Sequence, residues 1–91
     1  MEFEWDKTKD AANIAKHGLS FSQVTAIFDG FCVYARDSRY DYGEQRFLAI
    51  GALEAEAVVV VVFTYRGEKL RIISARPANK SERRHYYEAI R

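Results

Sequence analysis

Apolar and polar side chains recur along the first part of the chain with the spacing and caps of a helix. Asp6 is placed to cap a helix that begins at Lys7 and runs to about His17, and Gly18 supplies the left-handed residue at which it ends. The apolar stripe of this helix is weak, so its two caps define it better than its packing face does.

A second helix is predicted directly after the first. Ser20 and Gln23 form a capping box. Apolar residues then recur at the three- and four-residue spacing of a helix, namely Phe21, Val24, Ile27 and Phe28. The pair Asp29-Gly30 ends this short helix.

From residue 31 onward the pattern changes to that of β-strands. We expect strands at residues 31–35, 46–53, 57–65 and 69–76, with a polar connection at 37–44 and a turn at 66–68. The run 57–65 is almost entirely β-branched or aromatic, which predicts a central strand buried on both faces. Pro77 ends the last strand, because proline cannot continue a ladder of hydrogen bonds.

A closing helix follows. Asn79 and Glu82 form a reciprocal cap, which predicts a helix that runs to Ile90. The predicted fold is therefore α+β, with two N-terminal helices, an antiparallel β-meander of about four strands and a C-terminal helix. The chain of 91 residues is long enough for one domain, covering residues 1–91, with a small core that a partner or oligomer would stabilise.

Composition narrows the class of protein. Cys32 is the single cysteine, which excludes an internal disulfide and fits a reducing compartment. Residues 1–10 are charged rather than signal-like, and the apolar run 57–63 is too short to cross a bilayer, so we expect a cytoplasmic protein. Net charge is +1, but residues 66–91 carry +5 and residues 1–65 carry −4. A basic end of this kind either attracts phosphate or is an ordinary solvated helix face.

Three blocks of sequence, in order and spread over nearly the whole chain, resemble the BrnT family of toxins. They are residues 3–6 (FEWD) with Asn13, 16–18 (KHG) and Phe21; residues 41–46 (DYGEQR) with 50–51 (IG); and residues 71–76 (RIISAR) with Glu82, Arg83 and Tyr86. The resemblance implies a RelE-like fold and a ribonuclease that inhibits translation.

The same resemblance implies partners. The expected partner is a ribbon-helix-helix antitoxin, encoded next to the toxin, that neutralises it and represses the shared operon. It also implies an RNA substrate, a toxin–antitoxin heterotetramer and contact with DNA only through the antitoxin. No cofactor is expected.

RNA can be cleaved without a metal ion because it carries its own nucleophile. A base removes the 2′-hydroxyl proton, the oxygen attacks the adjacent phosphorus, and an acid protonates the leaving 5′-oxygen. Fixed guanidinium groups are natural stabilisers of the extra negative charge in the transition state. The sequence places three arginines on predicted strands: Arg46, Arg71 and Arg76.

Arg76 is the strongest catalytic candidate, because it ends a strand beside the start of a helix, where a phosphate is favoured. The predicted catalytic set is Arg76, Arg46, His17, Glu44 and Tyr86. The predicted substrate-binding set is Lys16, Arg71, Lys80, Arg83 and Tyr87. Arg71 and Arg76 point to opposite faces of a regular strand, so a bulge or an edge position is needed to bring them into one site.

Each candidate also has a structural interpretation. His17 and Lys16 can simply end a helix, Arg71 can pair with Glu44 or Glu68, and Arg46 with an acid of its own loop. Arg76 can hold the last helix through Glu82, and one of the two tyrosines is expected to pack while the other is free.

Two wider alternatives also remain. Asp37, Asp41 and Glu44 are spaced so that they could hold Mg²⁺, although their segment has the composition of a turn and no histidine or further acid completes a shell. A non-catalytic module of the same fold, which binds its antitoxin or nucleic acid without cleaving it, is the alternative function.

Overall fold

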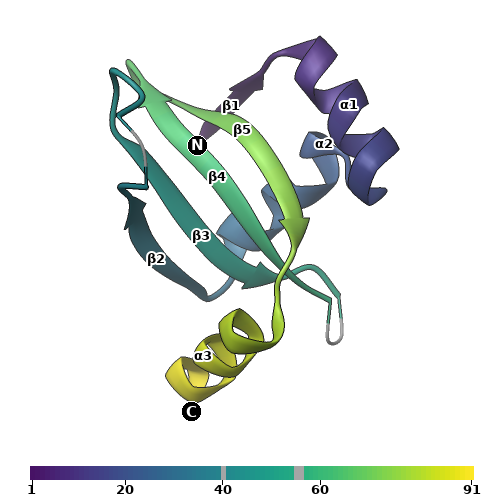
Figure 1. The fold of residues 1–91 in the computed structure, drawn as a ribbon, viewed down its shortest axis with the longest axis vertical. Coiled ribbons are helices and arrows are strands. Elements are labelled where there is room, and N and C mark those ends of the chain that lie inside the picture. Colours follow the sequence, from purple (N-terminus) through teal and green to yellow (C-terminus); the bar gives the residue numbers. More distant parts are fainter. Residues whose placement is uncertain (40, 55–56) are drawn as a thin grey trace.

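Five strands form one mixed sheet, in the order β1-β5-β4-β3-β2, in a computed structural model that describes residues 1–39, 41–54 and 57–91 (Figure 1). The strands are β1 (Glu2–Trp5), β2 (Cys32–Asp37), β3 (Arg46–Ala52), β4 (Val58–Arg66) and β5 (Lys69–Pro77). The helices are α1 (Lys7–His17), α2 (Phe21–Val24), the 3-10 helix η1 (Thr25–Asp29) and α3 (Lys80–Ile90). Tyr40, within the predicted connection 37–44, lies outside the described residues.

The predicted order of two N-terminal helices followed by an antiparallel meander is wrong, because the chain begins with a strand. β1 pairs in parallel with β5 and makes the sheet mixed. Its polar and apolar residues alternate, and Phe3 and Trp5 pack against the core. Four residues are too few to distinguish this alternation from a charged, irregular chain end. The partner also lies far along the chain, since Glu4 is aligned with Arg71.

The helix caps agree with the sequence-based predictions. Asp6 accepts a hydrogen bond from the backbone N–H of Lys9 (2.9 Å), and Gly18 ends α1 with a φ of 70°. Ser20 accepts from the backbone N–H of Gln23, which is one half of the predicted capping box; the reciprocal bond from the Gln23 side chain is not among the hydrogen bonds of the described residues. The reciprocal cap of α3 is present. These caps depend on residues within a few positions of one another, which is why the sequence predicts them well.

β4 lies at the centre of the sheet, and every residue from Val58 to Thr64 is buried, as its β-branched sequence predicts. One face of the sheet carries the larger core cluster, in which Phe21, Val24 and Ile27 of α2 and η1 pack on the strands. On the other face, α3 covers only one end and packs Tyr86 against the sheet. We call this second, partly covered surface the open face.

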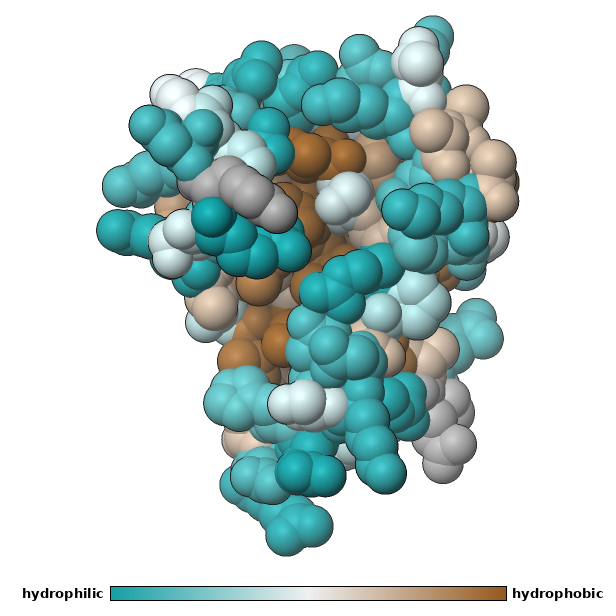
Figure 2. Space-filling model, viewed as in Figure 1, coloured by the Kyte–Doolittle hydropathy of each residue, from teal (hydrophilic) through white to brown (hydrophobic). Residues whose placement is uncertain are grey.

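Figure 2 shows how the hydrophobic and hydrophilic side chains are distributed on one side of the molecule. Hydrophobic side chains are visible in the middle and are ringed by hydrophilic ones. The apolar residues of the open face are Ile50, Val58 and Val60, with Val33 and Leu48 partly buried beside them. On this side of the molecule, hydrophilic side chains thus surround a hydrophobic centre.

Candidate active site

A bulge in β5 brings three polar side chains to the open face. Val62 pairs with Ser74 and Phe63 pairs with Ile72, so Ile73 is an extra residue in β5. The extra residue changes the alternation, and Arg71, Ser74 and Arg76 therefore share the open face. The sequence analysis required such a bulge before both arginines could contribute to one surface, and the structure supplies it.

A row of charged and polar residues crosses the open face at the end far from α3. The register aligns one residue from each strand, in the order Asp37, Arg46, Thr64, Arg71 and Glu4. Arg71 donates a hydrogen bond to Glu4 at 2.5 Å. The predicted partners of Arg71 were Glu44 or Glu68. Its observed partner lies on β1, the strand that the sequence analysis missed.

Arg46 and Glu44 lie together at this end of the sheet. The guanidinium of Arg46 lies over the ring of Tyr42, 3.9 Å from its centroid, and its Nε atom is 3.8 Å from Oε1 of Glu44. Glu44 also contacts Arg66 at 3.4 Å. The Nε atom of Arg46 is buried and has no hydrogen-bond partner in the described part of the chain. The predicted pairing of Arg46 with an acid of its own loop is thus close to what is observed.

Arg76 lies at the other end of the open face, paired with Val60 of β4. Its Nη1 and Nη2 atoms donate to the two carboxylate oxygens of Glu82, at 2.7 and 2.8 Å. This two-point pairing raises the pKa of Arg76 and lowers that of Glu82. Four residues of β4 separate this position from the row at Thr64, roughly 13 Å along a strand. Arg76 and Arg46 therefore do not meet at one point.

Asp37 and Arg39 form a second fork that sequence reasoning did not single out. The buried Asp37 carboxylate accepts from Nε and Nη2 of Arg39, at 2.9 and 3.0 Å, and from the Tyr42 hydroxyl at 3.3 Å. These hydrogen bonds, with Arg39 foremost, lower the pKa of Asp37. The charge of Arg39 also makes a small contribution to the pKa values of Arg76 and Glu82. In the sequence, the signal that could have indicated this pair is a carboxylate and an arginine two positions apart at the end of a strand.

A cavity lies between Arg76 and α1. We call this space, about 330 Å³ in volume, the basic cavity. Its polar lining is formed by Lys9, Asn13, Lys16, His17, Ser74 and Arg76. It opens beside the part of β5 that β1 does not cover, because β1 pairs only as far as Ile72. The structure thus brings three predicted residues, His17, Lys16 and Arg76, to one space, and none of the described residues that line it is acidic.

Asn13 fixes the wall of this cavity. It is 8 % exposed, donates to the carbonyl of Leu19 at 2.9 Å, and accepts from the backbone N–H of Ala75 at 3.1 Å. The bond to Ala75 holds α1 against β5, and the bond to Leu19 holds α1 to the connection that leads into α2. Because the side chains of Lys16 and His17 follow Asn13 on the same helix, their positions relative to Arg76 are fixed by this contact.

The predicted residues of α3 separate into a buried and an exposed group. Tyr86 is 5 % exposed and its ring packs 5.8 Å from that of Phe31. Tyr87 is 38 % exposed and lies 5.8 Å from the guanidinium of Arg83. Lys80 is exposed in the first turn of the helix. One tyrosine packs, as predicted, and it is Tyr86. The other is partly exposed but not free, because the ring of Tyr87 also lies 5.3 Å from that of Tyr86.

The three acidic residues weighed as a magnesium site each have a protein partner. Asp37 binds Arg39, Asp41 accepts from the backbone N–H of Gly43 at 3.0 Å, and Glu44 contacts Arg46 and Arg66. Within the described ranges, no three His, Cys, Asp or Glu side chains are grouped so that they could hold a metal ion.

Comparisons with known proteins agree with this architecture. A model of the family described as "Ribonuclease toxin, BrnT, of type II toxin-antitoxin system" matches residues 5–82. The chain is also similar to the crystal structure of the Brucella abortus ribonuclease toxin BrnT, with a TM-score of 0.67 and 32% sequence identity. That match covers 88% of this chain and 99% of the Brucella chain. No curated protein sequence matches the chain.

These matches place the chain in the class of ribonuclease toxins. It belongs to the BrnT family, whose members are ribonuclease toxins of type II toxin–antitoxin systems. An antitoxin partner and an RNA target follow from membership of this family. Among the helices of the described residues, none has the length and apolar character needed to cross a bilayer.

Proposed function

We propose that the protein cleaves RNA at the basic cavity, without a metal ion, by attack of the 2′-hydroxyl on the adjacent phosphate. A base accepts the 2′-hydroxyl proton as the oxygen forms a bond to phosphorus, and the bond to the 5′-oxygen breaks. An acid gives a proton to that leaving oxygen. The products are one end with a 2′,3′-cyclic phosphate and one with a free 5′-hydroxyl.

The observation that carries this proposal is that Arg76 and His17 line the same cavity. Glu82 occupies the Nη1 and Nη2 end of the Arg76 guanidinium and thereby fixes its orientation. A guanidinium has five N–H donors, so the Nε side can still bind phosphate oxygens while Glu82 holds the opposite end. Preorganised donors of this kind stabilise the charge that develops on phosphate in the transition state.

The remaining residues take roles that follow from their positions. The His17 imidazole accepts the 2′-hydroxyl proton in its neutral form, or gives a proton to the leaving 5′-oxygen in its protonated form, and Lys16 attracts the phosphate. Arg46, Glu44 and Arg71 lie farther along the open face, so we assign them to the RNA strand on one side of the cut. To the strand on the other side we assign Lys80, Arg83 and Tyr87. We assign Tyr86 to packing α3 onto the sheet.

Incubation of purified protein with RNA in EDTA tests the proposal. The carboxylates that could bind Mg²⁺ are engaged by arginines or a backbone N–H, so we expect chelation to leave the rate unchanged. Mapping of the ends should find cyclic phosphates. Loss of cleavage in EDTA with recovery on added Mg²⁺ would contradict the mechanism and leave the family assignment intact.

A wider set of properties belongs to the same proposal. We infer that cleavage inhibits translation in the cytoplasm and that a ribbon-helix-helix antitoxin, encoded next to the toxin, neutralises it in a heterotetramer. DNA is contacted only through the antitoxin. The alternative is a non-catalytic module, which is favoured by the fact that Glu82 already occupies one end of Arg76. Binding of RNA by pure, folded protein without any cleaved ends would support that alternative.

A further inference from the structure

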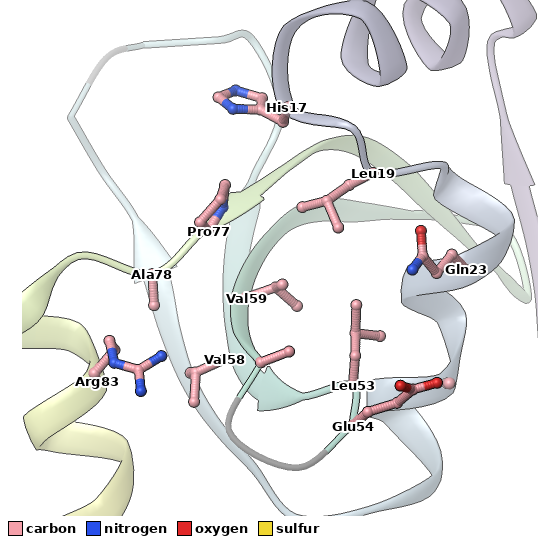
Figure 3. A pocket seen from close by; sticks show the side chains of 12 residues that line it. His17, Leu19, Gln23, Leu53, Glu54, Val58, Val59, Pro77, Ala78 and Arg83 are labelled. Atoms are coloured by element: carbon pink, nitrogen blue, oxygen red, sulfur yellow. The ribbon is translucent and has the colours of Figure 1, made fainter.

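A second cavity adjoins the basic one and differs from it in chemistry. It has a volume of about 400 Å³ and lies between α2, the residues Leu53 and Glu54 that follow β3, and the start of α3 (Figure 3). Leu19, Leu53, Val58 and Val59 form its interior in Figure 3. We call this space the apolar cavity.

His17 lines both cavities. A strand whose phosphate lies in the basic cavity can therefore reach the mouth of the apolar one. Arg83 lines the apolar cavity as well, and Tyr87 lies against Arg83. In Figure 3, His17 and Arg83 stand at the rim, and Gln23 and Glu54 lie across the cavity from Arg83.

This combination matches the chemistry of a nucleobase. A base has two apolar faces and a polar edge, and sequence-specific recognition of single-stranded RNA commonly stacks a base on an aromatic ring or an arginine guanidinium. His17 and Arg83 supply one group of each kind at this cavity. The aliphatic interior suits the faces, while the Gln23 amide and the Glu54 carboxylate can bond to donors and acceptors on the edge. The cationic rim suits the phosphates on either side of the base.

We propose that the apolar cavity binds one unstacked nucleobase of the RNA, next to the phosphate held in the basic cavity, and so determines where the RNA is cut. This inference rests on the proposed function, because it takes the RNA strand to lie across His17. It adds a base-binding subsite to the cleavage site and names Gln23 and Glu54 as the residues that contact the base edge.

An abasic nucleotide tests the subsite, because it removes the base and keeps both phosphates. Short RNAs carry one abasic position, moved in turn across the cleavage site. The wild-type protein should show one position, beside the cut, at which loss of the base raises KM by roughly tenfold, the size expected for one stacked base. Abasic substitution at more distant positions should have little effect.

Variants that fill the apolar cavity with a larger side chain provide the second part of the test. Ala26 lines it, and Ala26→Phe should remove the difference between the intact and the abasic RNA. Gln23→Phe fills the same space from an exposed position of α2 and serves if Ala26→Phe does not fold. The matched control is Ala15→Phe, an exposed alanine of α1 outside the lining, which should keep the tenfold difference.

The outcomes distinguish this inference from the proposed function. A wild-type protein that cuts intact and abasic RNA equally well, or a filled variant that keeps the difference, would overturn the subsite and leave the cleavage mechanism standing. If the wild type produces no cyclic phosphate, the cleavage mechanism fails. The subsite can then still be tested by measuring how the same variants bind intact and abasic RNA that 2′-O-methyl groups protect from cleavage. If Ala26→Phe weakens only antitoxin binding, the cavity belongs to the antitoxin and the inference is wrong.

Discussion

The side chain of Arg76 both forms an ion pair and lines a cavity. Its end-on fork holds Glu82 and thereby the first turn of α3, and Nη1 also donates to the carbonyl of Pro77 at 3.4 Å. The same side chain lines the basic cavity. The ion pair restricts the guanidinium to one orientation, so less conformational freedom is lost when a phosphate binds. The structural and the catalytic interpretations of Arg76 are therefore compatible at this position.

We expect Arg76→Ala to fold, to bind the antitoxin and to lose about a hundred- to a thousand-fold in cleavage rate, the usual effect of removing one preorganised donor. Arg76→Lys should restore only part of the rate, because an ammonium is a point charge without the planar fork. Rates on RNA and melting temperatures measure the two contributions separately. A lower melting temperature with normal cleavage by the folded variant would show that Arg76 acts only through Glu82.

Glu82→Gln isolates the ion pair, because glutamine can keep the reciprocal cap with Asn79. In the folded state, the hydrogen bonds with Arg76 lower the pKa of Glu82 below its usual value of 4.5. The ionised carboxylate therefore stabilises the protein at pH values above 4.5, and this contribution is lost as the pH falls through the lowered pKa. At pH 7 we expect a loss of about 1 kcal/mol, or roughly 5 °C in Tm. Melting curves from pH 7 down to pH 3 should show the wild type and the variant converging at low pH.

At the scale of elements, the packing of η1 on β3 depends on a glycine. A Cβ at Gly51 would lie 2.8 Å from the Cβ of Ile27 and 3.0 Å from the Sγ of Cys32. Ile27 is buried in the larger core cluster, so it has little room to move. The side of β3 that faces η1 therefore has no space for a side chain at this position.

We expect Gly51→Ala to destabilise the protein by about 1–3 kcal/mol, the usual cost of overpacking a core. Gly30→Ala is the matched control, because its added Cβ would lie 4.0 Å from its one neighbour, the carbonyl oxygen of Ile27. Chemical denaturation of both variants measures the difference. Equal stabilities would mean that η1 shifts to accommodate the methyl group and that the contact at Gly51 does not constrain the fold.

The elements that the sequence predicts are those with local signals. Caps at Asp6, Ser20 and Asn79 involve residues three positions apart, and the β-branched run of β4 is continuous. β1 and the bulge at Ile73 have no such signal, since both are defined by pairing with distant strands. The errors in the predicted fold therefore come from long-range pairing rather than from local propensity.

The residues of the candidate site also divide into those with a local signal in the sequence and those without one. His17, Lys16 and Arg76 occur at the ends of predicted elements, where their chemistry is visible in the sequence, and the fold brings them to one cavity. The pair of Asp37 and Arg39 went unnoticed, because its acid looked like part of a polar turn. The apolar cavity is formed by four separate segments of chain, so no spacing in the sequence indicates it.

At the scale of the whole molecule, the fold gathers the positive charge of the last strand and helix with that of α1. Residues 66–91 carry +5, and the basic cavity adds Lys9 and Lys16 from the otherwise acidic first part of the chain. An antitoxin that covers this surface would block both the phosphate and the base. Neutralisation then needs no change in the toxin's own structure.

This arrangement leads to a prediction for living cells. Expression of the protein alone should arrest growth, and co-expression with the adjacent antitoxin gene should restore it, because RNA and antitoxin compete for one surface. The Arg76→Ala variant is the control: it should be harmless alone, yet it should still bind the antitoxin and, when present in excess, free the wild-type toxin from it. Normal growth of cells that contain soluble wild-type protein without antitoxin would contradict the toxin function. Growth arrest by Arg76→Ala at wild-type strength would instead show that toxicity does not depend on cleavage at this cavity.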